Sequence, residues 1–242
     1  MPTGYSTFAN FEQSTHLAPC ATCTNGASSE PPARRSLDIG ANIGACTVQM
    51  LSLSSASVIA VEPSPVNLFH LTRSLRLAAS AQVGVASRVT VLPVAVGDAA
   101  QRREMFYEKG NHGDTRMAEV DGSNKTTTTL FDHLTDSPVE VHQLDDLLKL
   151  SIASEQYSHL NVSLMKVDTQ GFECRALKGS VALLTSGAVE SVVCELSKAM
   201  LRQLCQPDQV KWFFRKAGYS IVSLGREKGI SGEANMVARR NP

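Results

Sequence analysis

The stretch SLDIGANIGA, residues 36–45, decides which fold this chain is expected to adopt. A short apolar run leads into Asp38, and Gly40 and Gly44 then enclose the tripeptide Ala-Asn-Ile. Gly40 permits a sharp reversal of the chain, and Gly44 lets the next helix pack closely against a sheet. Such a turn is typical of the first strand-to-helix connection of an open parallel sheet, where ligands bind beyond the carboxyl ends of the strands.

Later apolar runs, rich in valine and isoleucine, predict strands that are covered on both faces. They span residues 58–62, 89–96, 163–168 and 190–196. Helical spacing of apolar residues predicts helices over residues 63–79, 173–187 and 208–218. Residues 219–240 predict a terminal antiparallel pair of strands around a glycine-rich turn. Strands that alternate with helices in this way indicate an α/β fold built on a mostly parallel sheet.

Local signals set the ends and faces of the predicted helices. Ser64 is placed to cap the first helix, and Pro65 suits its first turn. Trp212, in the third helix, is expected in the core. Gly187 ends the second helix. One face of that helix carries Cys174, Leu177, Val181 and Leu184.

One polar segment, residues 99–138, interrupts the alternation and is too long for an ordinary connection. We expect it to be an insert that acts as a lid or a substrate-binding element, framed by a hairpin of residues 103–108 and 139–142. Residues 1–35 predict a variable or flexible N-terminal arm, with a processed targeting peptide as the alternative. The main domain is then expected to span residues 36–242.

Charge and composition narrow the class of partner. The 23 lysines and arginines balance 23 aspartates and glutamates, so the net charge at pH 7 is zero and no nucleic-acid partner is expected. No apolar run is long enough to span a bilayer, and the N-terminal residues lack the apolar core of a signal peptide. A cytoplasmic location is therefore expected, with organellar targeting or a missing upstream anchor as alternatives.

Cysteine usage favours a reducing compartment. Cys46, Cys174 and Cys194 fall in apolar runs, where cysteine is usually a small buried apolar side chain. Cys20 and Cys23 have the spacing of metal ligands, but no second pair completes a zinc site.

The glycine spacing argues against the common nucleotide cofactors. The dinucleotide fingerprint needs glycine where this chain has Asn42 and Ala45, and no phosphate-binding loop of the Walker type follows. A nicotinamide oxidoreductase is therefore a remote alternative. A cofactor with one nucleoside and no phosphate fits better, and S-adenosylmethionine (SAM) is the candidate.

Acidic residues that follow the predicted strands supply expected contacts to SAM. Asp38 is expected to hold the cationic methionine amine, directly or through water. Glu62, followed by Pro63, ends the second strand about where an acid contacts the ribose hydroxyls of a nucleoside. Asp98 is placed to reach the adenine amino group. The expected cofactor-binding turn is completed by Gly40, Asn42 and Gly44.

The order of several longer stretches resembles a known family. LDIGANIG, VIAVEPSPVNLFHLTRSL, LPVAVGD, LDDLL, LMKVDTQGFECRALKGS and VVCELS, between Ser36 and Leu224, resemble the FkbM family of SAM-dependent methyltransferases. The resemblance implies a Rossmann-like class I methyltransferase fold, with a seven-stranded, mostly parallel sheet, an antiparallel last strand and helices on both faces. It also implies methyl transfer to a hydroxyl of a small-molecule acceptor, such as a sugar or natural product.

Two features depart from the family pattern. The N-terminal arm shows little of the helical lead-in that the resemblance implies. Thr169 and Gln170 stand where the family commonly has an apolar residue and an acid, so Gln170 is not a guide to the chemistry.

Carboxylates near the predicted strand ends are the candidate catalytic groups. Asp168 is expected beside the reacting sulfonium, where it takes the proton of the acceptor hydroxyl or orients that hydroxyl. Its alternatives are to cap the next helix or to bind the methionine end of SAM. Glu173 begins a helix, so its alternative to substrate contact is interaction with the helix dipole. Glu195 is expected as a substrate contact.

Other polar residues near the site have alternative interpretations. Asp145 and Asp146 are interpreted as acids at a helix start, and their alternative is a cation site shared with Asp168. The sequence shows no assembled set of ligands, so we predict no metal site. His112 and His142 are alternative bases if the insert folds over the site. A catalytically silent SAM-binding or interaction module, and methyl transfer to RNA or protein, stay open as alternative functions, as does the oligomeric state.

Overall fold

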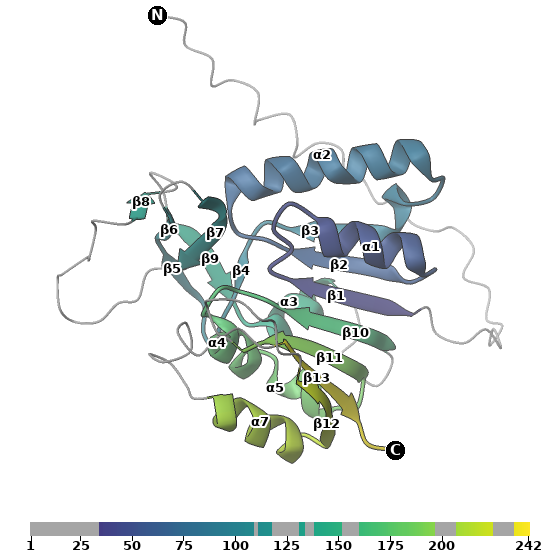
Figure 1. Ribbon diagram of the computed structural model, residues 1–242, viewed down its shortest axis with the longest axis vertical. Coiled ribbons are helices and arrows are strands. Elements are labelled where there is room, and N and C mark those ends of the chain that lie inside the picture. The colour runs from purple at the N-terminus through teal and green to yellow at the C-terminus, as the bar shows by residue number, and fades with distance from the viewer. Residues whose placement is uncertain are drawn as a thin grey trace, which may run out of the picture. The chain divides into compact units, whose positions relative to one another are not determined.

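A seven-stranded sheet forms the centre of the domain in the computed structural model, which describes residues 34–108, 111–117, 131–133, 138–151, 160–196, 207–224 and 235–242. The strand order is β12-β13-β11-β10-β1-β2-β3 (Figure 1). All neighbours pair in parallel except β13, which runs antiparallel to β11 and β12. The expected sheet, with its antiparallel last strand, is confirmed. The strands are β1 (Arg35–Ile39), β2 (Ser57–Val61), β3 (Val89–Leu92), β10 (Val162–Val167), β11 (Val189–Glu195), β12 (Tyr219–Leu224) and β13 (Asn235–Arg240).

Helices cover both faces of this sheet, as expected (Figure 1). Side chains alternate along each strand. In β2, Val58 and Ala60 pack in an apolar cluster with helices α1 and α2, while Ile59 and Val61 pack in a second cluster with the other four helices. The helices are α1 (Ala45–Leu53), α2 (Pro65–Ala81), α3 (Leu144–Ser151), α4 (Glu173–Lys178), α5 (Val181–Thr185) and α7 (Pro207–Lys216), with a short 3-10 helix η1 (Ala86–Arg88). None of the helices in the described ranges is long and apolar enough to cross a membrane.

The start of α2 follows the predicted capping signals. The backbone N–H of Asn67 donates to the Ser64 hydroxyl at 3.3 Å, and Pro65 is the first helical residue. Proline has no N–H to leave unpaired there. Leu71 and Leu75 are buried on the inner face, so local sequence and packing agree on where this helix begins and how it faces.

The prediction of one helix over residues 173–187 is wrong, because the chain breaks into α4 and α5. A Cβ atom at Gly179 would lie 1.9 Å from the backbone oxygen of Gly97, so the two segments touch backbone to backbone. The Asp145 carboxylate accepts hydrogen bonds from the N–H groups of Ala182 and Leu183 and so caps α5. Val181, expected on the buried face, is 40% exposed.

Trp212 is also misplaced by the sequence prediction, since it is 61% exposed instead of buried. The buried face of α7 carries Val210 and Phe214. Trp212 lies outside that face, where the ammonium of Lys216 sits 5.8 Å from the centre of its ring.

Cysteine chemistry differs from the expectation at one position. Cys174 is buried, but it forms a disulfide whose partner lies outside the described residues. Cys194 is a fully buried free thiol, as expected, and Cys46 is a partly buried one.

The insert forms strands of its own. Pro93 lacks a backbone N–H, and the predicted strand 89–96 breaks around it into β3 and β4. One three-stranded sheet has the order β4-β9-β5 and a second the order β7-β6-β8. The expected hairpin between residues 103–108 and 139–142 forms only where Arg103 pairs with Val139. Residues 105–108 pair instead with β7 and β8 inside the insert. The strands are β4 (Ala95–Val96), β5 (Gln101–Arg103), β6 (Met105–Glu108), β7 (Asn111–Met117), β8 (Phe131–His133) and β9 (Val139–His142).

Candidate functional site

A cleft lies at the carboxyl ends of β1, β2 and β10, where ligands bind in open parallel sheets. It holds about 580 Å³ of space, counting the part open to solvent. Four segments line it: the β1–α1 turn, the end of β2 with the start of α2, the β3–β4 connection with the insert, and the β10–α4 turn. The predicted cofactor residues that line it are Gly40, Asn42, Glu62, Pro63 and Asp168.

The β1–α1 turn is held close to both neighbouring strands. Gly40 has a φ of +80°, and a Cβ atom there would lie 1.8 Å from the backbone oxygen of Asp168. Only glycine fits so close to another backbone. The N–H groups of Gly40 and Ala41 both donate to the carbonyl of Val61. Asn42 also adopts a left-handed conformation, with a φ of +51°.

Glu62 is a buried carboxylate that organises the rim of the cleft. Its side chain is 4% exposed and accepts hydrogen bonds from the N–H groups of Asn42 and Ser64 and from the Asn67 amide, at 2.8, 2.9 and 3.2 Å. Two of these reach Oε1 and one reaches Oε2. A carboxylate offers about four lone-pair positions, so Oε2 keeps the capacity to accept a further bond. Burial raises the pKa of Glu62, and these hydrogen bonds only partly oppose that effect.

Asp38 lies beneath the cleft and does not line it. It is 0% exposed, accepts a 2.6 Å hydrogen bond from the Thr47 hydroxyl, and pairs with the Lys166 ammonium at 3.2 Å. Its counter-charge is therefore supplied from within the protein. Lys166 also donates to the carbonyl of Gly40 at 2.9 Å and lies 3.3 Å from Asp168 Oδ2.

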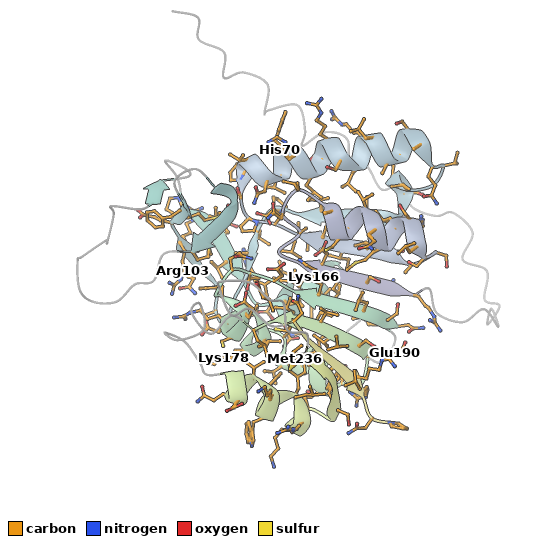
Figure 2. All side chains as sticks on the ribbon, viewed as in Figure 1. His70, Arg103, Lys166, Lys178, Glu190 and Met236 are labelled. Atoms are coloured by element: carbon orange, nitrogen blue, oxygen red, sulfur yellow. The ribbon has the colours of Figure 1, made fainter. Side chains whose placement is uncertain are left out.

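Lys166 was not among the predicted site residues. It lies in β10, and its ammonium connects this strand to Asp38 of the neighbouring β1 (Figure 2). It sits in register with Asp38 on the α1–α2 side of the sheet. The available signal was a lysine in the middle of the apolar run 163–168, two residues before Asp168. In a strand, this spacing places both side chains on one face.

Asp168 follows β10 and carries a carboxylate that contacts three other side chains. Lys166 approaches Oδ2, and the Gln170 amide donates to Oδ1 at 2.9 Å and to Glu195 Oε2 at 3.3 Å. Burial raises the pKa of Asp168, but the Lys166 ammonium and hydrogen bonds with Glu195, Lys166 and Gln170 outweigh burial, so the pKa lies below its ordinary value. The structure thus brings together Asp168 and Glu195, two of the predicted site residues, with Gln170, which was not among them.

Glu173 holds the β10–α4 turn. It is buried and accepts hydrogen bonds from the N–H groups of Thr169 and Gly171. Burial raises its pKa, and the backbone hydrogen bonds oppose this rise. Asp168, Glu173 and Glu195 form an acid cluster, with one oxygen from each lying within 4.8 Å of the others. From the sequence we predicted no set of metal ligands. The acid cluster nevertheless places three carboxylate oxygens close together, and hard cations prefer oxygen ligands of this kind.

Several predicted residues lie away from the cleft lining. Asp98 is held by Arg175, whose Nη1 lies 3.1 and 3.2 Å from its two carboxylate oxygens. A Cβ atom at Gly44 would lie 2.6 Å from Leu71, so this glycine makes room for α2. His142 contacts Glu140 on the surface. The side chain of His112 lies outside the described residues.

An apolar wall completes the cleft and was not predicted. It consists of Val94, Ala95, Val96, Met105, Met117 and Phe172. Met105 and Met117 belong to the insert, which therefore contributes directly to the cleft. The guanidinium groups of Arg103 and Arg175 lie 5.6 and 5.5 Å from the centre of the Phe172 ring and help to fix it.

Comparison with known proteins agrees with this architecture. A structure of methyltransferase FkbM from Methylobacillus flagellatus KT superposes with a TM-score of 0.54 at 18% identity, covering 86% of this chain. The present chain spans 44% of the length of that chain. A conserved hypothetical protein from Streptococcus pyogenes gives a TM-score of 0.47 at 13% identity, covering 86% of this chain and 88% of the other. No curated protein matches.

Sequence comparison defines the relationship further. The family model described as the methyltransferase FkbM domain matches residues 38–221, which include both glycines of the β1–α1 turn, Glu62 and the whole acid cluster. The chain therefore belongs to the FkbM methyltransferase family.

Proposed function

We propose that the protein binds SAM in the cleft and transfers its methyl group to a hydroxyl oxygen of a small-molecule or sugar-like acceptor. One observation carries the proposal. Gly40, Glu62 and Asp168 follow three neighbouring strands and line the same cleft. Membership of a methyltransferase family makes SAM the natural methyl donor for such a site.

The residues of the cleft suit the parts of SAM. Glu62 Oε2 has spare capacity to accept a bond from a ribose hydroxyl. The apolar wall offers a surface for an adenine ring. Because Gly40 has no side chain, the β1–α1 turn can lie against the backbone of Asp168, so the two turns border the same cleft. The predicted adenine contact of Asp98 is not part of this proposal, because Arg175 holds that carboxylate.

The chain's own groups would position the acceptor. When bound, SAM supplies an electrophilic methyl group on a sulfonium, and the remaining task is to orient the acceptor oxygen and exclude water. A carboxylate whose pKa is lowered is a weak base but a good hydrogen-bond acceptor. We therefore assign Asp168 to orient the hydroxyl and to accept its proton, which becomes strongly acidic as the new carbon–oxygen bond forms, with Glu195 beside it.

The insert is the element we assign to acceptor selection. Met105 in β6 and Met117 in β7 bring flexible, apolar side chains to the cleft, so the insert supplies part of its lining. The zero net charge of the chain favours a small acceptor over a nucleic acid.

A labelled-transfer assay tests the proposal. The purified protein is incubated with SAM carrying a labelled methyl group and with fractionated metabolites, sugars, phenols, lipids and RNA. We expect label in a small hydroxylated acceptor, recovered as a methyl ether. Binding of SAM without transfer to any of these classes would instead identify a catalytically silent SAM-binding module. Transfer to RNA would refute the acceptor class.

A further inference from the structure

We infer that Gln170 is a positioning residue whose side-chain amide holds the Asp168 and Glu195 carboxylates together in the role that a divalent cation would otherwise fill. The inference deepens the proposed function and rests on it for its catalytic meaning. Its structural content can be tested without any methyl acceptor.

The geometry assigns both contacts to one nitrogen. Nε2 of Gln170 lies 2.9 Å from Asp168 Oδ1 and 3.3 Å from Glu195 Oε2. A primary amide has two N–H donors, so both hydrogen bonds can form at once. Asp168 follows β10 and Glu195 ends β11, so Gln170 links the ends of neighbouring strands.

The backbone is built to direct this side chain. Gln170 has a φ of +53°, a left-handed conformation that is unfavourable for a residue other than glycine. The turn is fixed on both sides, because Glu173 accepts hydrogen bonds from the N–H groups of Thr169 and Gly171. An unfavourable conformation that is held in this way often accompanies a functional role for the residue.

Charge explains why an amide suits this position. The acid cluster brings three carboxylates together, and Asp168 and Glu195 also share a direct hydrogen bond. Lys166 approaches the Oδ2 side of Asp168 while it also pairs with the buried Asp38. Gln170 adds donors on the opposite oxygen without adding charge. The titratable groups that face this cluster from the surrounding elements are Asp38, Cys46, Lys166 and Cys194.

A carboxylate at position 170 would reverse this arrangement. It would have the same shape but no donors, and it would place its oxygens against Asp168 and Glu195. Like charges at such distances need a shared proton or a cation. Gln170→Glu is therefore expected to create a cation site that the amide now makes unnecessary.

Manganese binding tests the inference, with Mn²⁺ alone as the probe and electron paramagnetic resonance of free Mn²⁺ as the readout. Gln170→Glu should bind Mn²⁺ at least about tenfold more tightly than the wild-type protein, because affinity for such cations rises with the number of charged ligands. Mn²⁺ should also raise the unfolding temperature of this variant and not that of the wild-type protein. If Gln170 had a merely structural role, Mn²⁺ would not raise the unfolding temperature of Gln170→Glu.

The matched control adds the same charge elsewhere. Gln82 is exposed at the end of α2, about 22 Å along the helix from Asn67 at the cleft. Gln82→Glu should leave Mn²⁺ affinity unchanged. An equal gain in both variants, or no gain in Gln170→Glu, would overturn the inference.

A second measurement covers the case in which Gln170→Glu does not fold. The wild-type protein should show no Mn²⁺ site that Glu195→Gln removes. A wild-type site that is tighter than about 0.1 mM, in the range of sensor-type cation sites, and that is lost in Glu195→Gln would show that the amide does not replace a cation. SAM binding by the same wild-type preparation is measured separately, so failure of the proposed function and failure of this inference are distinguishable.

Discussion

Replacing Lys166 with methionine tests whether a buried ion pair holds the cleft together. The side chain of Lys166 is 15% exposed and that of Asp38 is 0% exposed, with 3.2 Å between Nζ and Oδ1. Methionine keeps most of the apolar stem but removes the charge. Asp38 would retain the Thr47 hydroxyl as a donor and lose its counter-charge.

The expected cost follows from burial. Breaking a buried ion pair by removing one partner costs about 3–5 kcal/mol, because a charge is left in the interior. Total unfolding free energies are about 5–15 kcal/mol, so the variant should lose a large share of its stability. The second contact of Lys166 adds less, since the Asp168 side chain is 35% exposed and solvent screens it.

The pH range of this contribution follows from the pKa of Lys166. Burial alone would lower that pKa, but the carboxylates of Asp38 and Asp168 outweigh burial and raise the pKa above 10.5. Stability from the pair is therefore complete below 10.5 and is lost only as the pH rises beyond that value through the folded-state pKa.

Urea unfolding at pH 7, followed by circular dichroism, measures the effect. The midpoint should fall by about 1–2 M in Lys166→Met. The control is Lys178→Met on the exposed face of α4, expected to change the free energy of unfolding by less than about 0.5 kcal/mol (Figure 2). The double variant Asp38→Asn, Lys166→Met should recover more than half of the loss. A change below about 1 kcal/mol in Lys166→Met would refute the buried-pair interpretation.

Three further predictions concern the cleft. Gly40→Ala should unfold the domain or weaken SAM binding more than about tenfold, because its Cβ would lie 1.8 Å from the Asp168 oxygen. Gly84→Ala, with a similar φ of +85° and nothing within 4 Å, should cost only about 1–2 kcal/mol, and equal effects in thermal melts would contradict the close approach. Glu62→Gln should weaken SAM binding by about 1–3 kcal/mol. Because burial raises the pKa of Glu62, wild-type affinity should begin to fall in acid at a pH above 4.5, while the variant stays flat in calorimetry; a flat wild-type profile would argue against this role. Asp168→Asn should keep SAM affinity within a few fold and slow transfer about a hundredfold, and unchanged turnover would leave Asp168 only a structural role.

Periodicity predicted the fold because the sheet is buried on both faces. The apolar runs formed strands in the expected order along the chain, although the run 89–96 divided into β3 and β4. In β2, odd and even residues pack in different clusters, which is why the run is apolar throughout. The start of α2 was equally local, since Ser64 and Pro65 act within one turn.

Tertiary contacts account for the fold features that were missed. The break between α4 and α5 depends on Gly97, a residue far away in sequence that touches Gly179. Trp212 lies on a helix whose buried face is already filled by Val210 and Phe214.

The sequence predicted the site residues that follow strand ends. It did not predict the ion pairs between side chains of different elements. Glu62 and Asp168 were expected because they follow apolar strands, and both line the cleft. Lys166 was interpreted only as part of an apolar strand. Its register with Asp38 places its ammonium between the carboxylates of Asp38 and Asp168. Asp98 was expected in the cleft, but Arg175 holds it from another element.

Isothermal titration calorimetry with SAM, its demethylated product and NAD⁺ tests the central claim most directly. The claim is that the cleft between the β1–α1 turn, Glu62 and the β10–α4 turn accepts a single nucleoside carrying a sulfonium. We predict one site per chain for SAM and for its product, weakened in Glu62→Gln, and no binding of NAD⁺. Folded protein that binds neither SAM nor its product, or that binds NAD⁺ more tightly, would contradict the account.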